Sequence, residues 1–554
     1  MGFKPVSTWA EGDWIVAIAL AIFAMFLAGG AAIAARREPE ALGHPKGLYM
    51  LFFAEMWERF SYYGMRALLI FYLTKHWLFD DSKSNLIYGA YTSLVYITPV
   101  LGGYLADRYL GQRKAVLFGG ILLMIGHFLM AFEGMQGILD PAVKQADPFI
   151  NIFWAALAFI IVGSGFLKAN ISVIVGQLYP RTDLRRDGAY TIFYMGINLG
   201  AAVGTILVGY LGETIGWAYG FGLAGIGMLA GLIVFVLGRG SLRGAGEAPV
   251  RTDGKTVNDT LLYAIGIAAV AVIWGLIQYQ DVIQTLLIIS GIALLGYVLY
   301  EAFKLDKEPR ERIFAILFLI ALNPLFWGLF EQAGGSINLY TDRFVDRAGV
   351  PATLFQSINP IYIILLAPLF AGLWVMLGKR GLEPSAPAKF GLALLQVGAG
   401  FLVFVWGANA FPIGEEAKTA VMFVFLLYLL HTTGELCLSP VGLSAMNRLA
   451  PAYMASLIMG AWFYMTAVGN FVAGKIGEAT GGHGGEMTKD STLAIYDKIG
   501  WISVGVGVIV LALSPIVKRW MHLDTLRDTR DLAGDRELAE PQAAGANLSG
   551  EAKA

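Results

Sequence analysis

The stretch AEMWERFSYYGMR (residues 54–66) places two glutamates and two arginines inside an otherwise apolar segment. LYMLFF precedes it and ALLIFYLT follows it, so the whole segment is long enough to cross a bilayer. A charged side chain at the centre of a membrane helix costs about 2.5–3.5 kcal/mol on insertion scales. We therefore expect the rest of the chain to supply partners or a function for these four charges.

The composition is that of a polytopic membrane protein. Of the 554 residues, 57% are hydrophobic and only 15% are charged, whereas soluble domains carry about 25% charged residues. The net charge of −1 gives no reason to expect nucleic-acid binding. Cys437 is the only cysteine, which excludes an intrachain disulfide, and the six scattered histidines show no metal-ligand spacing. We expect no metal, no other cofactor and no enzyme activity.

A hydropathy window of about 19 residues predicts about fifteen membrane spans. Their approximate bounds are 14–35, 48–75, 86–106, 114–133, 150–178, 189–211, 217–238, 260–278, 283–303, 312–333, 353–378, 388–409, 418–446, 452–477 and 495–519. A hydrophilic linker occupies 238–259, and the tail from His522 onward is charged and then rich in Ala, Gly and Glu. Such a tail is predicted to be solvated and mostly disordered.

Lysine and arginine concentrate in alternate loops along the whole chain, and cytoplasmic loops carry this excess. Examples are RR at 36–37, RYLGQRK at 108–114 and RTDLRR at 181–186. The C-terminus is therefore predicted to be cytoplasmic, and an odd number of spans puts the N-terminus in the periplasm. The predicted location is the cell (inner) membrane, crossed many times.

The first span needs separate treatment because it ends in AGGAAIAARR, and small residues before a polar stretch resemble a signal-peptidase site. Cleavage there would release Arg36 and Arg37 on the wrong side for all the later spans. We therefore predict an uncleaved extra helix.

The spans predict an all-α polytopic fold of two six-helix bundles, with two inserted helices and one extra N-terminal helix. The predicted segments are the extra helix with its linker at 1–43, the first bundle at 44–238, a cytoplasmic linker with the two inserted helices at 239–311, the second bundle at 312–520 and the tail at 521–554. Two comparable halves are typical of transporters built from repeats, whose substrate site lies near mid-membrane between the halves. The composition alone also allows an exporter, a facilitator or a channel.

The charges of the quoted stretch form a stripe along one helix face. The spacing i, i+4, i+7, i+8 and i+11 groups five residues on that face: Glu55, Arg59, Tyr62, Tyr63 and Arg66. Glu58 flanks the same face. If the helix begins near Gly47, Glu55 is about 12 Å along it, too deep for side chains to reach the near surface. The stripe must therefore face protein or water, with its charges paired.

Three later spans supply charges of the right sign. Lys168 interrupts IIVGSGFLKANISVIVG, Glu331 interrupts LFWGLFEQAGG, and Glu435 interrupts LLYLLHTTGELCLSPVG. One interpretation is a set of structural ion pairs that hold helices together. The other is a proton and anion site in a water-filled cavity between the halves, because a carboxylate beside an arginine can bind and release a proton. The second interpretation accounts for all the charges together.

AEMWERFSYYGMR matches the ExxER motif with its following YYG of the proton-dependent oligopeptide transporter family, a branch of the major facilitator superfamily. LGGYLADRYLGQRK (101–114), GSGFLKANIS (163–172), FYMGINLGA (193–201), FWGLFEQ, SINPIY, GELCLSPVGLS and MGAWF also resemble family motifs and follow in family order. The resemblance covers about residues 44–520, and the two inserted helices are typical of bacterial members. It implies a proton-coupled symporter that imports di- and tripeptides by alternating access. It implies small peptides, protons and the bilayer as partners, and a monomer as the functional unit.

The resemblance also implies roles for individual residues in peptide binding. Arg66 and Lys168 would face the peptide carboxylate and Glu435 the amino terminus, and the signs of these charges agree with that assignment. The remaining substrate-binding residues would be Asn198 and Asn359 for the peptide backbone, Tyr62, Tyr63, Tyr96, Trp327 and Trp462 as aromatic walls, and Ser439 of the SPVGLS motif. For the aromatic residues, ordinary packing or a place in the interfacial belt is an equally good interpretation.

The family resemblance likewise assigns the coupling residues. Glu55, Glu58 and Arg59 would form a proton relay that communicates with Lys168. Glu331 would pair with Arg66 across the two halves, and protonation of Glu331 would release Arg66 for the peptide and weaken an extracellular gate. A conformational latch in the cytoplasmic loop would use three further residues: Gly103, Asp107 and Arg108.

Some features depart from the family or leave other substrates open. Most members lack the helix at 14–35, and the second-helix histidine of animal members has no counterpart here, so proton sensing should rest on carboxylates. His431 lies one turn before Glu435 and is either part of its hydrogen-bond network or an ordinary buried histidine. The alternative functions are transport of nitrate or another small anion, and drug/proton antiport. Glu435 argues against a pure anion, which needs no carboxylate.

Overall fold

The computed structural model describes residues 9–36, 38–180, 183, 185–248 and 258–524. The predicted tail beyond residue 524 and part of the predicted linker lie outside these residues.

The first half of the chain is a bundle of long helices. Its elements are α1 (Glu11–Ala35), α2 (Lys46–Phe71) with a π-helical turn (Tyr72–His76), α3 (Asp81–Leu105) with a second π-helical turn (Ala106–Leu110), α4 (Gln112–Met130), the short α5 (Pro141–Gln145), α6 (Ile150–Gln177), α7 (Arg185–Thr214), α8 (Trp217–Gly238) and η4 (Arg239–Leu242). Strands β1 (Glu40–Ala41) and β2 (His44–Pro45) form a small antiparallel hairpin between α1 and α2.

The second half begins after two intervening helices, α9 (Asp259–Leu276) and α10 (Gln280–Phe303). Its elements are α11 (Lys307–Ala321), α12 (Asn323–Phe330), η5 (Glu331–Gly334), α13 (Ser336–Phe344), η6 (Ala352–Ser357), α14 (Ile358–Lys379), α15 (Ala386–Ala410), α16 (Val421–Leu449), η7 (Ala452–Met454), α17 (Ala455–Thr480), η8 (Gly482–Gly484) and α18 (Lys489–Trp520). Strands β3 (Val345–Asp346), β4 (Pro412–Ile413) and β5 (Lys418–Ala420) form one small sheet in the order β3-β5-β4.

The predicted all-α membrane architecture is confirmed. Within the described residues, 14 helices are long and apolar enough to cross a membrane. Helix α2 is outside this count because of its charged residues, the stripe that the sequence singled out. The predicted span 312–333 ends too early, because α11, α12, η5 and α13 continue one after another to Phe344.

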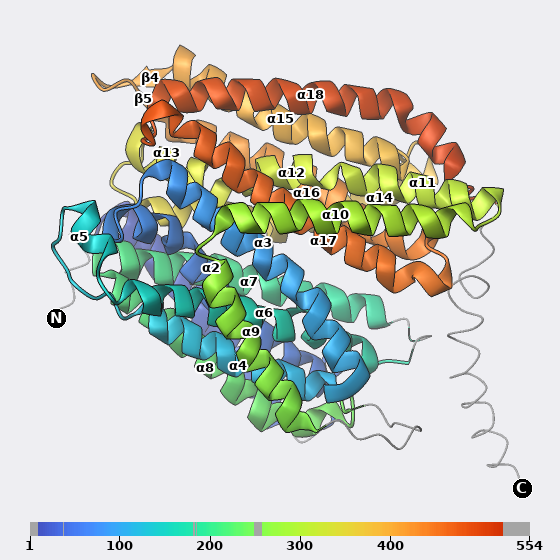
Figure 1. The fold of residues 1–554 in the computed structure, drawn as a ribbon. Coiled ribbons are helices and arrows are strands. Elements are labelled where there is room, and N and C mark those ends of the chain that lie inside the picture. Colours follow the sequence, from blue (N-terminus) through green and yellow to red (C-terminus); the bar gives the residue numbers. More distant parts are fainter. Residues whose placement is uncertain (1–8, 37, 181–182, 184, 249–257, 525–554) are drawn as a thin grey trace, which may run out of the picture.

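The helices form two bundles with a boundary between them (Figure 1). Helices α2 to α8 make one bundle and α11 to α18 the other, while α10 runs along the boundary in this view. The two bundles lie together near α5 and α13 and diverge toward the end of α18. We call the first of these ends of the molecule the α5 end, and the other, which carries η4 and the C-terminal end of α18, the linker end.

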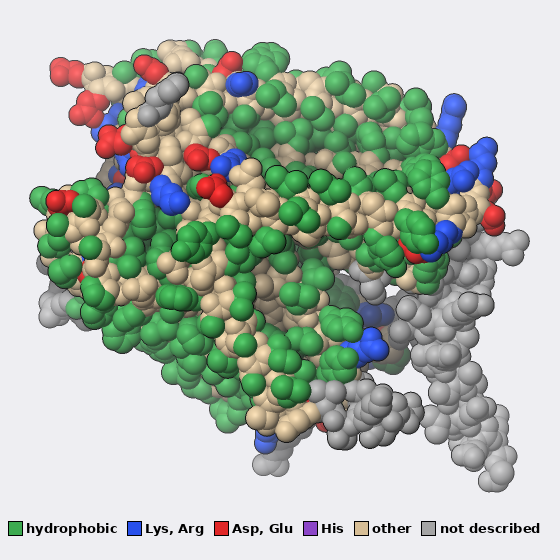
Figure 2. Space-filling view, viewed as in Figure 1, with side chains coloured by type: hydrophobic (Ala, Val, Ile, Leu, Met, Phe, Trp, Pro, Cys, Tyr) green, Lys and Arg blue, Asp and Glu red, His purple; other side chains and the backbone are tan. Residues whose placement is uncertain are grey.

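Apolar side chains cover the middle of the molecule, and charged side chains gather toward the two ends (Figure 2). This distribution fits a protein whose central band lies in the hydrocarbon core of a bilayer, about 30 Å thick, with its two ends in the headgroup regions.

Two close helix contacts position the interior. Gly204 of α7 lies so near α2 that a Cβ atom there would be 2.2 Å from the Phe60 carbonyl oxygen, which is why α2 and α7 pack without side chains between them. Gly89 of α3 and Gly474 of α17 meet across the two halves, and a Cβ at Gly89 would be 2.5 Å from the Gly474 Cα. Backbone therefore lies against backbone at both contacts.

Candidate functional site in the interior

The charged stripe of α2 is buried, as the sequence predicts. Glu55, Glu58, Arg59 and Arg66 are each less than a tenth exposed. The Arg59 guanidinium lies between two carboxylates, with its Nη2 2.6 Å from Glu55 and its Nε 3.2 Å from Glu58. Its Nε also donates a hydrogen bond to Glu55 Oε1 at 2.7 Å. Glu55 Oε2 and both oxygens of Glu58 accept no hydrogen bond from the described residues. One cation thus faces two carboxylates, an arrangement with room for a proton.

Lys168 of α6 contacts aromatic rings. Its Nζ lies 4.0 Å from the centre of the Tyr62 ring and 5.0 Å from the centre of the Tyr96 ring. Such contacts stabilise an ammonium group through the ring quadrupole. No ion pair joins Lys168 to Glu55 or Glu58 within the described chain, and its predicted communication with the relay stays a prediction. Tyr62 is fully buried and Tyr63 packs against it at right angles, with 5.2 Å between their ring centres.

Arg66 and Glu331 form a buried ion pair that joins the two halves. The pairing that the family resemblance suggested is therefore present in the structure. Arg66 Nε also lies 2.5 Å from the Tyr88 hydroxyl oxygen, and its guanidinium lies 5.7 Å from the centres of the Tyr63 and Tyr88 rings. Glu331 is the first residue of η5, where the helix changes from α12 to a short 3-10 turn. This break directs the carboxylate toward α2.

Glu435 of α16 lies in a separate polar group. Asn359 Nδ2 donates hydrogen bonds to Glu435 Oε2 and to Thr432 Oγ1, each at 3.0 Å. The His431 ring instead has its Nε2 3.2 Å from the Val397 carbonyl oxygen. His431 is therefore an ordinary buried histidine in this conformation, and Asn359 rather than His431 donates the hydrogen bond to the Glu435 carboxylate.

The remaining predicted residues differ in how they are held. Asn198 donates to the Tyr194 carbonyl within α7 at 3.0 Å. Trp462 is buried against Phe390, with 6.2 Å between ring centres, which favours the packing interpretation. Trp327 Nε1 and Ser439 Oγ are buried and have no hydrogen-bond partner within the described chain. The roles of all these residues stay predictions.

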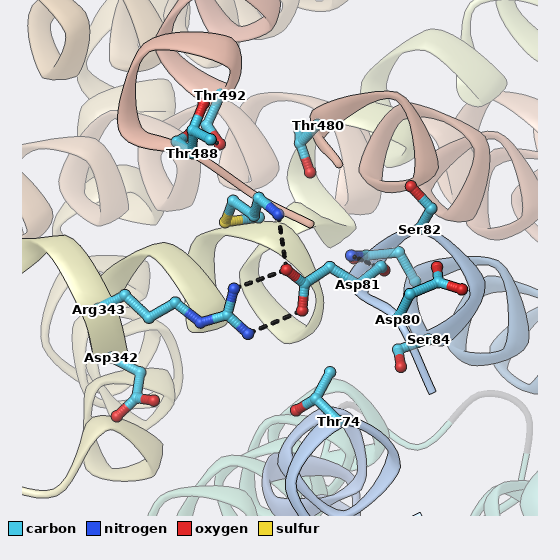
Figure 3. Close-up of polar contacts among 12 residues, drawn as sticks. Thr74, Asp80, Asp81, Ser82, Ser84, Asp342, Arg343, Thr480, Thr488 and Thr492 are labelled. Carbon is cyan, nitrogen blue, oxygen red and sulfur yellow. Dashed lines mark hydrogen bonds and ion pairs between the residues drawn. The ribbon is translucent and has the colours of Figure 1, made fainter. Parts of the chain in front are cut away.

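The α5 end of the interior is closed by an ion pair that the sequence did not reveal (Figure 3). Asp81, at the start of α3, accepts two hydrogen bonds from Arg343 of α13, at 2.6 and 2.7 Å. The backbone N–H of Met487, just before α18, donates to the same carboxylate at 2.7 Å. Lys75 pairs with Asp342 beside it at 2.6 Å. The charged clusters DDSK and TDRF at one end of the molecule were the only available signal.

A second connection between the halves closes the same end. Glu213 near the end of α7 accepts hydrogen bonds from the backbone N–H groups of Ala352 and Thr353, at 3.0 and 3.1 Å, and from the Thr353 hydroxyl at 2.9 Å. A carboxylate at the start of a helical turn satisfies N–H groups that otherwise have no partner. Glu213 thereby fixes the start of η6 against α7.

The linker end is more open. On α3, Tyr91 is fully buried near the α5 end, whereas Tyr104 is 52% exposed toward the linker end. On α7, Asn198 is 5% exposed and Tyr194, one turn nearer the linker end, is 43% exposed. The two bundles also diverge in that direction (Figure 1). The interior charges are thus covered at the α5 end, while α3 and α7 expose more side-chain surface toward the linker end.

The predicted latch residues make local contacts. Gly103 faces Ala169 of α6. Asp107 accepts a hydrogen bond from Gln112 at 2.7 Å, and Arg108 donates to the Tyr104 hydroxyl at 3.0 Å. These contacts stay within the first half, and the latch role of the three residues stays a prediction.

These features define a class of protein: a helical membrane protein of two halves, with a charged interior between them, built for transport. Within the described residues, no group of three His, Cys, Asp or Glu side chains is placed to hold a metal ion.

Comparison with known proteins gives the family. The profile of the POT family matches residues 113–485. The uncharacterized transporter YclF of Bacillus subtilis is 37% identical over 86% of this chain and 95% of its own length. The peptide transporter YePEPT of Yersinia enterocolitica is 37% identical over 78% of this chain and 88% of its own length. The crystal structure of a POT family transporter in complex with a thioalcohol-conjugated peptide is 31% identical over 88% of this chain and 99% of its own chain, with a TM-score of 0.72.

The chain belongs to the POT family, and its fold is of the major facilitator type. The family and fold that the motifs suggested are therefore confirmed.

Proposed function

We propose that this protein is a proton-coupled symporter that imports di- and tripeptides by alternating access. The observation that carries the proposal is the buried arrangement of opposite charges, with Arg66 and Lys168 on one half and Glu331 and Glu435 on the other. A peptide of any sequence presents a carboxylate, an ammonium group and a backbone. The fixed cations match the carboxylate terminus of the peptide, and the fixed carboxylate matches its ammonium terminus. Unpartnered polar groups and aromatic rings tolerate varied peptide side chains.

Peptides are the substrates that fit this arrangement of buried charges best, for two reasons. The relative YePEPT is named as a peptide transporter, and the related solved structure holds a conjugated peptide. The Glu435 carboxylate, held by Asn359, is a group that a pure anion such as nitrate does not need. A drug/proton antiporter would need fewer paired charges and a more apolar cavity.

Proton coupling in the proposal uses the ion pair between Arg66 and Glu331. While Glu331 is ionised it occupies the Arg66 guanidinium, so a peptide carboxylate competes with it. Protonation of Glu331 removes the competing charge and frees Arg66 for the peptide. The Glu55–Arg59–Glu58 group, where two carboxylates share one cation, supplies a second place for a proton. The transported proton thus changes which carboxylate Arg66 binds.

The proposed orientation places the linker end in the cytoplasm, because the loops rich in Lys and Arg lie there. The structure is then an inward-facing conformation, with Asp81–Arg343 and Glu213 as parts of a closed extracellular gate. The C-terminus is cytoplasmic, the N-terminus periplasmic, and the membrane is the inner membrane. The functional unit is proposed to be a monomer that transports without cofactor and without chemical conversion of its substrate.

The test is uptake of labelled dialanine into proteoliposomes of the purified protein with an imposed inward proton gradient. We expect accumulation above the external concentration, loss of accumulation with a protonophore, and competition by unlabelled dialanine. Competition by nitrate instead of dialanine would identify the anion transporter. Uptake that is indifferent to both the gradient and the protonophore would refute proton coupling.

A further inference from the structure

The extra helix α1 leaves a long crevice against the first bundle at the linker end. The crevice has a volume of about 500 Å³ and lies between α1, α2, α8 and η4. Near mid-membrane, α1 packs tightly on α2, where Phe23 lies 5.0 Å from Trp57 and 5.8 Å from Phe60, measured between ring centres. Toward the linker end this contact gives way to the crevice, which the small residues Ala31 and Ala34 of α1 line on one side.

The dimensions of the crevice match one leaflet of a bilayer. Its lining on α2 runs from Trp57 to Lys46, which spans about 16 Å at 1.5 Å per residue. The hydrocarbon core is about 30 Å thick, so half of it is about 15 Å. Apart from its mouth the lining is apolar, with Met50, Phe53 and Val234 among its walls. A straight hydrocarbon chain of one leaflet fits such a slot.

The mouth of the crevice is cationic. The Lys46 ammonium donates a hydrogen bond to the Arg36 carbonyl oxygen and forms no ion pair with a described carboxylate. Glu40, on the nearby hairpin, is paired with Arg185 at 3.5 Å. The side chains of Arg36 and Arg239 are exposed at the same end. Of these basic residues, Lys46 lines the crevice itself, whereas Arg36, Arg239 and the exposed Glu38 lie outside its lining.

We propose that this crevice is a binding site for one anionic phospholipid of the leaflet at the linker end. One acyl chain lies between α1 and α2, and the phosphate-bearing headgroup lies beside Lys46. Attraction to anionic lipid amounts to roughly a five-fold gain in affinity for each basic residue near the surface. The extra helix then serves as one wall of a lipid site, a role independent of the substrate.

The test compares binding of two lipids, palmitoyl-oleoyl phosphatidylglycerol and palmitoyl-oleoyl phosphatidylethanolamine, to the full-length protein by native mass spectrometry in mild detergent. We expect phosphatidylglycerol to bind at least five-fold more tightly. Ala34→Phe fills the crevice from the surface of α1 and should lower phosphatidylglycerol binding about tenfold, and Ala31→Phe provides a second filling variant. The matched control Ala32→Phe adds the same ring to an exposed position outside the lining and should leave binding unchanged.

Charge is tested separately from shape. Lys46→Gln should reduce phosphatidylglycerol binding roughly five-fold and leave phosphatidylethanolamine binding unchanged. The control Lys379→Gln removes an exposed cation from the last residue of α14, outside the crevice, and should have no effect. Equal binding of the two lipids by the unmodified protein would overturn the anionic assignment. Equal effects of the Ala34→Phe and Ala32→Phe variants would overturn the site itself, whatever the result of the transport assay.

Discussion

The ion pair between Asp81 and Arg343 should set how often the α5 end opens. Asp81→Asn keeps the shape of the side chain but removes its charge, and one of the two Arg343 nitrogens then faces an amide N–H₂ group. Breaking a hydrogen-bonded charge pair costs 2–5 kcal/mol when it is buried. Asp81 is buried but the Arg343 side chain is 32% exposed, so water screens part of the loss and the lower figure applies. About 2 kcal/mol corresponds to a roughly 30-fold shift toward the conformation open at the α5 end.

The assay is labelling of a cysteine at Ser84, one turn beyond Asp81 on α3 and fully buried in this conformation. In a background of Cys437→Ser, the Ser84→Cys variant should react slowly with a membrane-impermeant thiol reagent in liposomes. Addition of Asp81→Asn should raise the rate about 30-fold. The swapped pair Asp81→Arg with Arg343→Asp should restore the part of the protection that depends on the ion pair, although arginine at position 81 cannot accept the hydrogen bond from the Met487 N–H.

The swapped pair also separates the ion pair from simple damage to α3. A local defect at Asp81 would persist in the swapped protein, whereas a broken ion pair would be repaired. The same labelling rate with and without Asp81→Asn would refute the idea that this pair holds the α5 end closed.

Four further substitutions test the interior and its packing. Glu331→Gln should abolish proton-driven accumulation of dialanine but keep counterflow, because Arg66 is then permanently free; intact accumulation would contradict the coupling scheme. Lys168→Ala should remove the pH dependence of uptake, and a normal pH profile would exclude its assigned role. Glu435→Gln should raise the KM for dialanine about tenfold through loss of a charged hydrogen bond, with no effect on competition by an N-acetylated dipeptide; equal loss for both compounds would count against amine recognition. Gly204→Ala should lower stability by about 1–3 kcal/mol through overpacking against α2, measured as thermal unfolding in detergent, while Gly222→Ala, which has open space around it, should not; matching melting curves would rule out tight α2–α7 packing.

The sequence was informative where physical constraints are local. Apolar length predicted the spans, and helical spacing predicted that the α2 charges share a buried face. The pairing of Arg66 with Glu331 lies across 265 positions of sequence, and only the motif resemblance pointed to it. Charge signs alone allowed other pairings.

The features that the sequence did not predict depend on three-dimensional proximity. Lys168 could have met a carboxylate but instead lies on the rings of Tyr62 and Tyr96, because ring contacts leave no charge pattern in a sequence. His431 had two open interpretations, and its ring direction depends on the neighbouring helix α15. The Asp81–Arg343 pair joins two helix ends that looked like ordinary loop charges. The continuation of the predicted span 312–333 through α13 was hidden by the glycines at 334 and 335 and by the polar residues after them.

At the contact between Gly89 and Gly474 the two halves meet through backbone alone, without side chains between them. Interlocked side chains would have to change rotamers before one helix could roll over the other, and each such change adds a barrier. Here α3 and α17 can tilt about a point where no side chains interlock. Nearer the α5 end the two helices are joined by a hydrogen bond from Ser82 Oγ to the Glu478 carbonyl oxygen at 2.8 Å. A tilt of α3 against α17 therefore has to break polar contacts of this kind at the end of the molecule rather than rearrange side chains at the Gly89–Gly474 contact.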